Sequence, residues 1–188
     1  MEQFPFPDKF TAREELPRDV VYGRIPSEKR NSVCDDAWET GVRTAEELFA
    51  QYPGMGIYSL FQVHGLEIVR EDVDKVSAGF RFFSEYDPKK NQVFIYVRSV
   101  GLFADKNGLA EQRAEELILA HEFYHFLEEN KIGKTSERYK LPILSLGPIK
   151  IGSTGVRSLC EIGAYGFAKT YWDRFLAGQS VGPEIPTA

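Results

Sequence analysis

The spacing of apolar residues along the chain predicts where its helices and strands lie. Between residues 35 and 52 apolar side chains recur three and four positions apart, which is the period of an amphipathic helix. These side chains are Trp38, Val42, Ala45, Leu48, Phe49 and Tyr52. Pro53 and Gly54 end the pattern. We therefore expect a first helix from Asp35 to Tyr52.

The next part of the chain changes from helix to sheet. Ile57 to His64 is predicted to be a short helix that stops at Gly65, and Leu66 to Arg70 alternates as a strand does. Residues 79–86 and 92–98 are rich in β-branched and aromatic residues, and a turn with Pro and Asn separates them. We expect these two segments to form a hairpin.

Two helices are predicted for the last third of the chain. Leu109 to Asn130 has neither Gly nor Pro and many strong helix formers, so it is expected to be a long central helix. Residues 131–155 contain several Gly and Pro residues and are expected to form a long irregular connection with one short strand at Ile149 to Ile151. A last helix is expected from Val156 to Leu176.

The chain is expected to form one domain between two peripheral segments. Its 188 residues suit one ordinary domain, and its composition does not change sharply along the chain. Four prolines predict an extended N-terminal arm at residues 1–31, and residues 177–188 are expected to be a flexible tail. The domain itself is placed at residues 32–176.

Composition and charge exclude several classes of function. The formal net charge is −5, so the broad positive field of a nucleic-acid-binding protein is missing and no direct nucleic-acid binding is expected. No apolar run approaches the ~18 residues of a membrane span, and the N-terminus has no signal-peptide pattern. Cys34 and Cys160 do not suggest a disulfide framework. We therefore expect a cytoplasmic protein without membrane contact.

The predicted central helix contains the pattern His-Glu-x-x-His at residues 121–125. Side chains four positions apart share one helix face, so His121 and His125 can bind one ion while Glu122 lies beside it. Zinc held in this way polarises a carbonyl group and lowers the pKa of water, whose proton the glutamate accepts. The pattern predicts a metallopeptidase with one Zn²⁺ per chain and Glu122 as general base. Packed core histidines are the alternative, and Mn, Fe or Co would also suit such ligands.

A catalytic zinc site needs a third protein ligand, and Glu161 is the best candidate. It lies on a stripe of the last helix that is otherwise apolar, where a charge needs a partner. The alternative is a capping box, because Ser158 and Glu161 have the Ser-x-x-Glu spacing of a helix start. Tyr165 or Tyr171 is a candidate hydrogen-bond donor to the oxyanion, although aromatic residues on a helix stripe also suit a core.

The two motifs together resemble the ImmA/IrrE family of gluzincin-like zinc peptidases. In that family a helix with His-Glu-x-x-His precedes one with Glu-x-x-Ala-x-x-Phe-Ala, which here is EIGAYGFA at residues 161–168. The resemblance covers residues 35–176 and implies an α+β, zincin-like minimal metallopeptidase fold, with a small three-stranded sheet packed against the central helix and the ligand helix. This chain has Tyr124 where the family usually has a small residue, and Glu128 where it often has a further His.

The resemblance implies that His121, His125 and Glu161 are the zinc ligands. It also implies a regulatory endopeptidase with a protein substrate, because the best characterised members cleave helix-turn-helix transcriptional repressors. In zincin-like folds the strand before the metal helix, here residues 92–98, lies at the cleft edge and pairs with substrate; an inner strand is the alternative. A non-catalytic zinc-binding sensor or protein-interaction domain on the same fold is the rival function. Glu122 favours the enzyme, since it ligates nothing in the predicted site.

Overall fold

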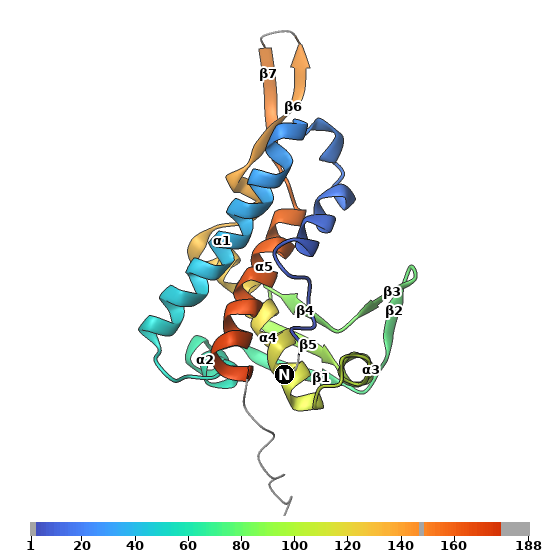
Figure 1. The fold of residues 1–188 in the computed structure, drawn as a ribbon, viewed down its shortest axis with the longest axis vertical. Helices are drawn as coiled ribbons and strands as arrows, with labels where there is room; N and C mark the ends of the chain where they lie inside the picture. Colours follow the sequence, from blue (N-terminus) through green and yellow to red (C-terminus); the bar gives the residue numbers. More distant parts are fainter. Residues whose placement is uncertain (1–2, 147–148, 178–188) are drawn as a thin grey trace, which may run out of the picture.

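Five α-helices and three small sheets make up the described part of the chain, which is residues 3–146 and 149–177 of a computed structural model (Figure 1). The helices are α1 (Ser27–Gln51), α2 (Ile57–His64), α3 (Val97–Asn107), α4 (Glu111–Leu127) and α5 (Ser158–Tyr171). The strands are β1 (Glu67–Glu71), β2 (Lys75–Ser77), β3 (Phe80–Phe82), β4 (Ser84–Asp87), β5 (Gln92–Tyr96), β6 (Lys140–Leu146) and β7 (Ile149–Gly155). Shorter helical turns lie at Thr11–Arg18, Tyr22–Arg24, Glu128–Ile132, Thr135–Arg138 and Trp172–Leu176. The expected α+β class is confirmed.

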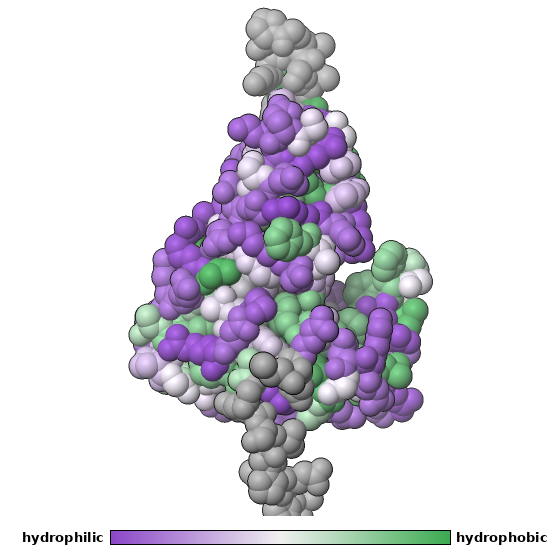
Figure 2. Space-filling model, viewed as in Figure 1, coloured by the Kyte–Doolittle hydropathy of each residue, from purple (hydrophilic) through white to green (hydrophobic). Residues whose placement is uncertain are grey.

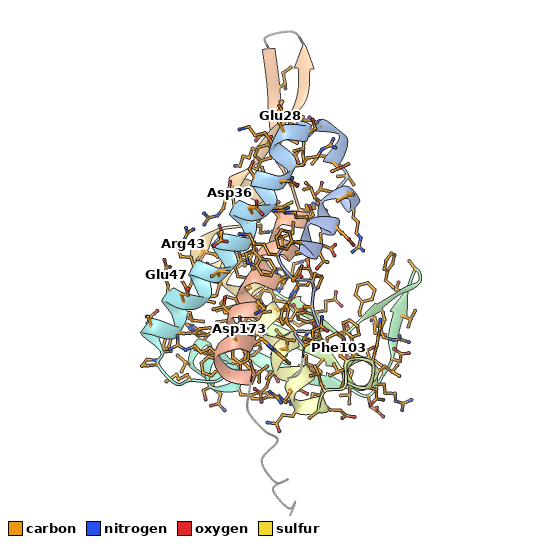
Figure 3. All side chains as sticks on the ribbon, in the orientation of Figure 1. Glu28, Asp36, Arg43, Glu47, Phe103 and Asp173 are labelled. Carbon is orange, nitrogen blue, oxygen red and sulfur yellow. The ribbon has the colours of Figure 1, made fainter. Side chains whose placement is uncertain are left out.

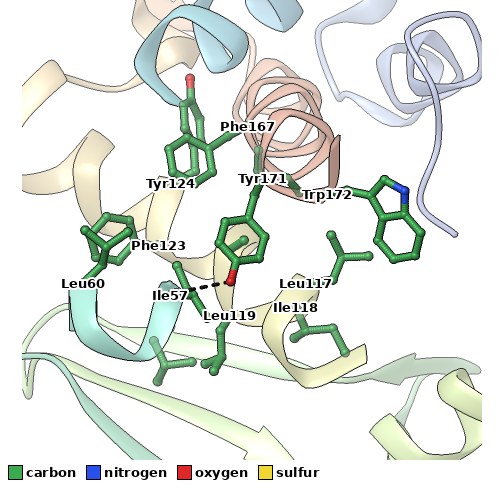
Figure 4. Packing of buried hydrophobic residues seen from close by; sticks show 14 of the residues in the cluster. Ile57, Leu60, Leu117, Ile118, Leu119, Phe123, Tyr124, Phe167, Tyr171 and Trp172 are labelled. Carbon is green, nitrogen blue, oxygen red and sulfur yellow. Dashed lines mark hydrogen bonds between the residues drawn. The ribbon is translucent and has the colours of Figure 1, made fainter. Parts of the chain in front are cut away.

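Helix α5 packs on α1 along one side and on α4 along the other (Figure 1). Glycines allow the close approach of α1 and α5. A Cβ atom added at Gly41 would lie 1.9 Å from the carbonyl oxygen of Gly163, and one at Gly166 would lie 2.4 Å from that of Trp38. Large buried side chains fill the space between α4, α5 and α2, as Figure 4 shows. The helix pair that carries the predicted motifs is therefore part of the main core.

The three-stranded sheet has the order β1-β5-β4. Strand β5 pairs in parallel with β1 and antiparallel with β4, so the hairpin predicted from the sequence is confirmed. Because β5 has a partner on each side, the expectation that residues 92–98 form the cleft edge is wrong. This strand ends at Tyr96, and it buries Val93 and Ile95 completely. Its neighbour β4 is the edge strand that contacts α4.

The N-terminal region is more helical than expected. Helix α1 begins at Ser27, whereas the sequence pattern predicted Asp35. Residues 11–18 form a helical turn that buries Ala12 and Leu16 in a second apolar cluster with α1 and α5, so residues 1–31 are not simply an extended arm. The Asp8 side chain accepts hydrogen bonds from the backbone N–H groups of Phe10 and Thr11 at the start of this turn. These short-range hydrogen bonds stabilise a helical turn in a segment whose prolines predicted an extended chain.

Two other segments also differ from expectation. Helix α3 follows β5 directly, whereas the sequence pattern predicted a strand up to residue 98 and no helix before Leu109. The connection at 131–155 is not irregular, because β7 begins at Ile149 and pairs with β6 as a projecting hairpin (Figure 1). The tail predicted at 177–188 lies, except for Ala177, outside the described residues. Both cysteines are free, and no helix in the described ranges is long and apolar enough to cross a bilayer.

Candidate metal centre

Side chains of α4 and α5 bring three potential metal ligands together. His121 Nε2 lies 3.2 Å from His125 Nε2 and 3.2 Å from Glu161 Oε2. Glu161 Oε1 lies 3.6 Å from His125 Nε2. The donor atoms of one tetrahedral zinc ion, each about 2.0–2.2 Å from the metal, are roughly 3.4 Å apart. The three side chains are therefore placed to hold a single metal ion, as the two sequence motifs predicted.

Helix geometry explains why the two histidines lie together, and the close packing of two helices explains why Glu161 reaches them. His121 and His125 are one turn apart on α4, so their rings share one face. Glu161 reaches them because α5 approaches α4 closely at Gly163, where an added Cβ atom would lie 2.5 Å from the Tyr124 hydroxyl oxygen. The large Tyr124 side chain is thus accommodated by a glycine on the facing helix.

Glu161 does not form the capping box that was the alternative interpretation of the Ser-x-x-Glu spacing. Its carboxylate faces the two histidines, and no side chain caps the start of α5 through the Ser-x-x-Glu pattern. The backbone N–H of Ser158 instead donates to Asp19 Oδ2 at 2.9 Å. An acidic residue from the N-terminal region thus satisfies this helix end, which leaves Glu161 available as a ligand.

A buried carboxylate orients His125. Glu128 is only 4% exposed, and its Oε2 lies 3.1 Å from His125 Nδ1. Its Oε1 accepts a 2.7 Å hydrogen bond from the backbone N–H of Thr135. Burial favours a neutral His125, but the bond to Glu128 and the charges of nearby carboxylates outweigh burial and raise the pKa of His125 to about 9. This role of Glu128 was not predicted from the sequence, although its i, i+3 spacing from His125 is a usable signal.

Packing orients His121. Its ring contacts the rings of Phe6 and Tyr165 at centroid distances of 5.7 and 5.2 Å. Its Nδ1 atom is buried and has no hydrogen-bond partner among the described residues. The two histidines therefore differ in their support, since one is held by a hydrogen bond and the other by neighbouring rings.

The predicted base Glu122 is held by the edge strand of the sheet. Ser84, the first residue of β4, donates a 2.6 Å hydrogen bond from Oγ to Glu122 Oε1. Glu122 is 8% exposed and lies beside the ligand group without belonging to it. No local pattern pointed to Ser84, because it is far from the metal helix in the sequence.

Two compartments of an open cleft meet at the metal centre. They measure about 610 Å³ and about 920 Å³, and both are lined by His121, Glu122 and Glu161. Phe6, Phe83 and Phe103 line only the smaller compartment, whereas Glu15, Arg18 and Arg157 line only the larger one. A chain segment bound in the cleft would therefore pass directly over the predicted ligands.

The two tyrosines proposed as oxyanion donors have different positions. Tyr165 lines both compartments next to the ligands, and burial, with the charges of Glu15 and Glu161, raises its pKa. Tyr171 is 1% exposed, and its hydroxyl group accepts a hydrogen bond from the backbone N–H of Ile57 in the core (Figure 4). The structure thus places Tyr165 in the cleft and Tyr171 outside it.

No protein-family model, no curated protein and no solved structure matches the chain. The metal centre is therefore interpreted from its residues and their geometry.

Proposed function

We propose that the chain is a zinc-dependent endopeptidase that hydrolyses peptide bonds of a protein substrate. The observation that carries this proposal is the convergence of His121, His125 and Glu161, with the buried Glu122 beside them, in an open cleft. Structural zinc sites are closed by four protein ligands, whereas catalytic sites have three and an open position. The side chain of Glu161 is 46% exposed, which supports the open, catalytic type.

The chain's own residues supply the proton transfers of such a reaction. When bound, a zinc ion polarises a carbonyl group and lowers the pKa of water. Glu122 Oε1 is engaged by Ser84, so Oε2 is the atom that accepts the proton of the attacking water and later delivers it to the leaving amine. Tyr165, one turn after Glu161 and facing the same cleft, is the candidate that stabilises the oxyanion.

The edge of β4 is the proposed place for the substrate backbone. One edge of this strand pairs with β5, and no described strand pairs with the other. Ser84, Glu85 and Tyr86 of β4 line the larger compartment of the cleft. An extended peptide can add to such an edge through main-chain hydrogen bonds, which give affinity without strong sequence preference. The pairing role expected of β5 is therefore proposed for β4.

The resemblance to the ImmA/IrrE family, and the zincin-like fold it implies, carry the more specific part of the proposal. They suggest a helix-turn-helix transcriptional repressor as substrate and a regulatory role in the cytoplasm. Two features of the site are compatible with a divergent member. Gly163 accommodates Tyr124, and Glu128 supports His125 from the position where the family often has a further His.

Metal content and hydrolysis, measured together, test the function. We expect about one zinc ion per chain by elemental analysis in wild type and in Glu122→Gln, and its loss in His121→Ala and Glu161→Gln. Wild type should cleave an unfolded test protein such as casein, and Glu122→Gln should not. Circular dichroism controls for folding. A wild-type chain that binds no zinc, or a Glu122→Gln variant that cleaves as fast as wild type, would contradict the proposal. Zinc without hydrolysis would favour a non-catalytic sensor.

A further inference from the structure

The β2–β3 hairpin carries an exposed aromatic surface. Phe80 is 69% exposed and Phe82 is 42% exposed. Side chains alternate along a strand, so both phenylalanines lie on one face of β3 and Arg81 lies on the other. Arg81 forms a bidentate pair with Asp74, at 2.7 and 3.0 Å. Large apolar side chains that are exposed together mark binding surfaces.

This aromatic face borders the cleft. Phe80 and Phe82 line both compartments, together with His121 and Glu161. In Figure 2 the hairpin projects from the side of the molecule, hydrophobic residues gather on it, and a hollow separates it from the body. The exposed rings therefore face the space in which a substrate of the proposed reaction would lie.

Further aromatic rings line the smaller compartment. Phe83 contacts Phe103 at a centroid distance of 5.0 Å, and Phe103, labelled in Figure 3, contacts Phe6 at 5.4 Å. Phe6 in turn contacts the His121 ring. Apart from His121, Glu122 and Glu161, the ionisable groups that line this compartment are Arg81, which is paired with Asp74, Lys106 and Tyr165. The rings of this compartment thus offer an apolar surface against which a bound side chain can pack.

The base of the hairpin is tied to α3. Ser99, which is fully buried, accepts a 2.9 Å hydrogen bond from the backbone N–H of Lys75 and donates a 3.0 Å hydrogen bond to Asp74. Asp74 also binds Arg81 on β3. These bonds hold both strands at the mouth of the cleft, so the two phenylalanines form a wall with a defined position.

We propose that Phe80 and Phe82 select peptides that place a bulky apolar side chain in the smaller compartment, next to the peptide bond that is cut. The inference rests on the proposed function, since it names the substrate class of the same site. Strand β3 is joined to β4 by Phe83 alone, so a peptide that pairs with the edge of β4 continues past Phe82. One apolar side chain received there changes affinity roughly 10- to 100-fold.

Binding to a variant that cannot hydrolyse tests this selection separately from catalysis. Zinc-loaded Glu122→Gln is titrated with fluorescent peptides that differ only in one central Phe, Ala or Asp, and fluorescence anisotropy gives Kd. The Phe peptide should bind about 10-fold or more tightly than the others. Introducing Phe80→Ala and Phe82→Ala together into the Glu122→Gln variant should remove this preference without changing its zinc content.

Val76→Ala is the matched control. Val76 is 53% exposed on the same hairpin, but it pairs with Arg81 on the opposite face and lines neither compartment. This variant should keep the preference for Phe. Equal affinity for the three peptides would overturn the inference. So would a loss of the preference for the Phe peptide in Val76→Ala as large as that in the variant with Phe80→Ala and Phe82→Ala. Hydrolysis by wild type without apolar preference would also overturn it while leaving the peptidase intact. Selective binding without hydrolysis would support the apolar site and refute the peptidase.

Discussion

At the residue scale, the metal centre depends on how single side chains hold the two histidines. Glu128 contacts His125 on one side and the backbone of Thr135 on the other, whereas His121 Nδ1 has no hydrogen-bond partner among the described residues and the His121 ring packs against Phe6 and Tyr165. A carboxylate that binds the far nitrogen of a metal-ligating histidine fixes the ring orientation and makes the ligand nitrogen more basic. Glu128 is therefore expected to contribute to metal affinity without touching the ion.

Replacing Glu128 by Gln tests this contribution. The variant keeps the size of the side chain but loses its charge, so zinc affinity should fall by about 10- to 100-fold. Competition with a chromophoric chelator measures the change. Glu129→Gln is the control, because Glu129 is exposed and pairs with Lys134 at 3.0 Å instead of with His125. Equal zinc affinity in Glu128→Gln and wild type would show that His125 does not need this support.

At the element scale, the contact between α1 and α5 determines where Glu161 lies. Gly41 on α1 faces the backbone of Gly163 on α5, and Gly163 also gives room to Tyr124 on α4. The position of the ligand helix therefore depends on two glycines that leave space for backbone and ring atoms. A side chain at either position would push α5 away from a neighbouring helix.

Gly41→Ala should destabilise the fold, although alanine is ordinarily the better helix former. Its Cβ atom would lie 1.9 Å from the Gly163 carbonyl oxygen, so we expect the free energy of unfolding to fall by about 3 kcal/mol. Urea unfolding measures the change, and zinc affinity should fall with it. Gly23→Ala is the control, because no atom lies within 4 Å of its added Cβ. A Gly41→Ala variant as stable as wild type would contradict this account of the helix contact.

At the scale of the whole molecule, the charges of the site link metal binding to pH and stability. Partial burial favours a neutral Glu161, but the hydrogen bond and charge of His121, with the charge of His125, lower its pKa to about 2. The pKa of His125 is raised to about 9. In the metal-free chain the raised pKa of His125 stabilises the fold below its ordinary pKa of 6.5, and this contribution is lost as the pH rises through 9. The contribution of Glu161 is present above its ordinary value of 4.5 and is lost as the pH falls through 2.

Zinc should therefore stabilise the chain more at pH 9 than at pH 6. At pH 6 the metal competes with a proton on His125 and replaces an ion pair that already stabilises the fold. Thermal unfolding of the zinc-loaded and chelator-treated chain at both pH values measures the difference. The increase in Tm caused by zinc should be larger at pH 9, and an increase that is the same at both values would contradict the linkage.

Features that depend on short-range spacing were predictable from the order of residues. The sequence was sufficient to place His121, Glu122 and His125 on one helix, because a helix turn relates positions four apart whatever surrounds them. The stop of α2 at Gly65 was predictable for a similar reason, since this residue has φ of 66°, a conformation that glycine adopts without strain. The position of Glu161 on an apolar stripe likewise followed from the helix period.

Features that depend on contacts between distant segments required the tertiary structure. No sequence pattern distinguishes Tyr165 from Tyr171 as an oxyanion donor. Only the packing of α5 places Tyr165 in the cleft and Tyr171 in the core. The bond from Ser84 to Glu122 and the ring of Phe6 against His121 join segments that have no common pattern. Such contacts depend on how all elements pack at once, whereas the motif on α4 depends only on the geometry of one helix.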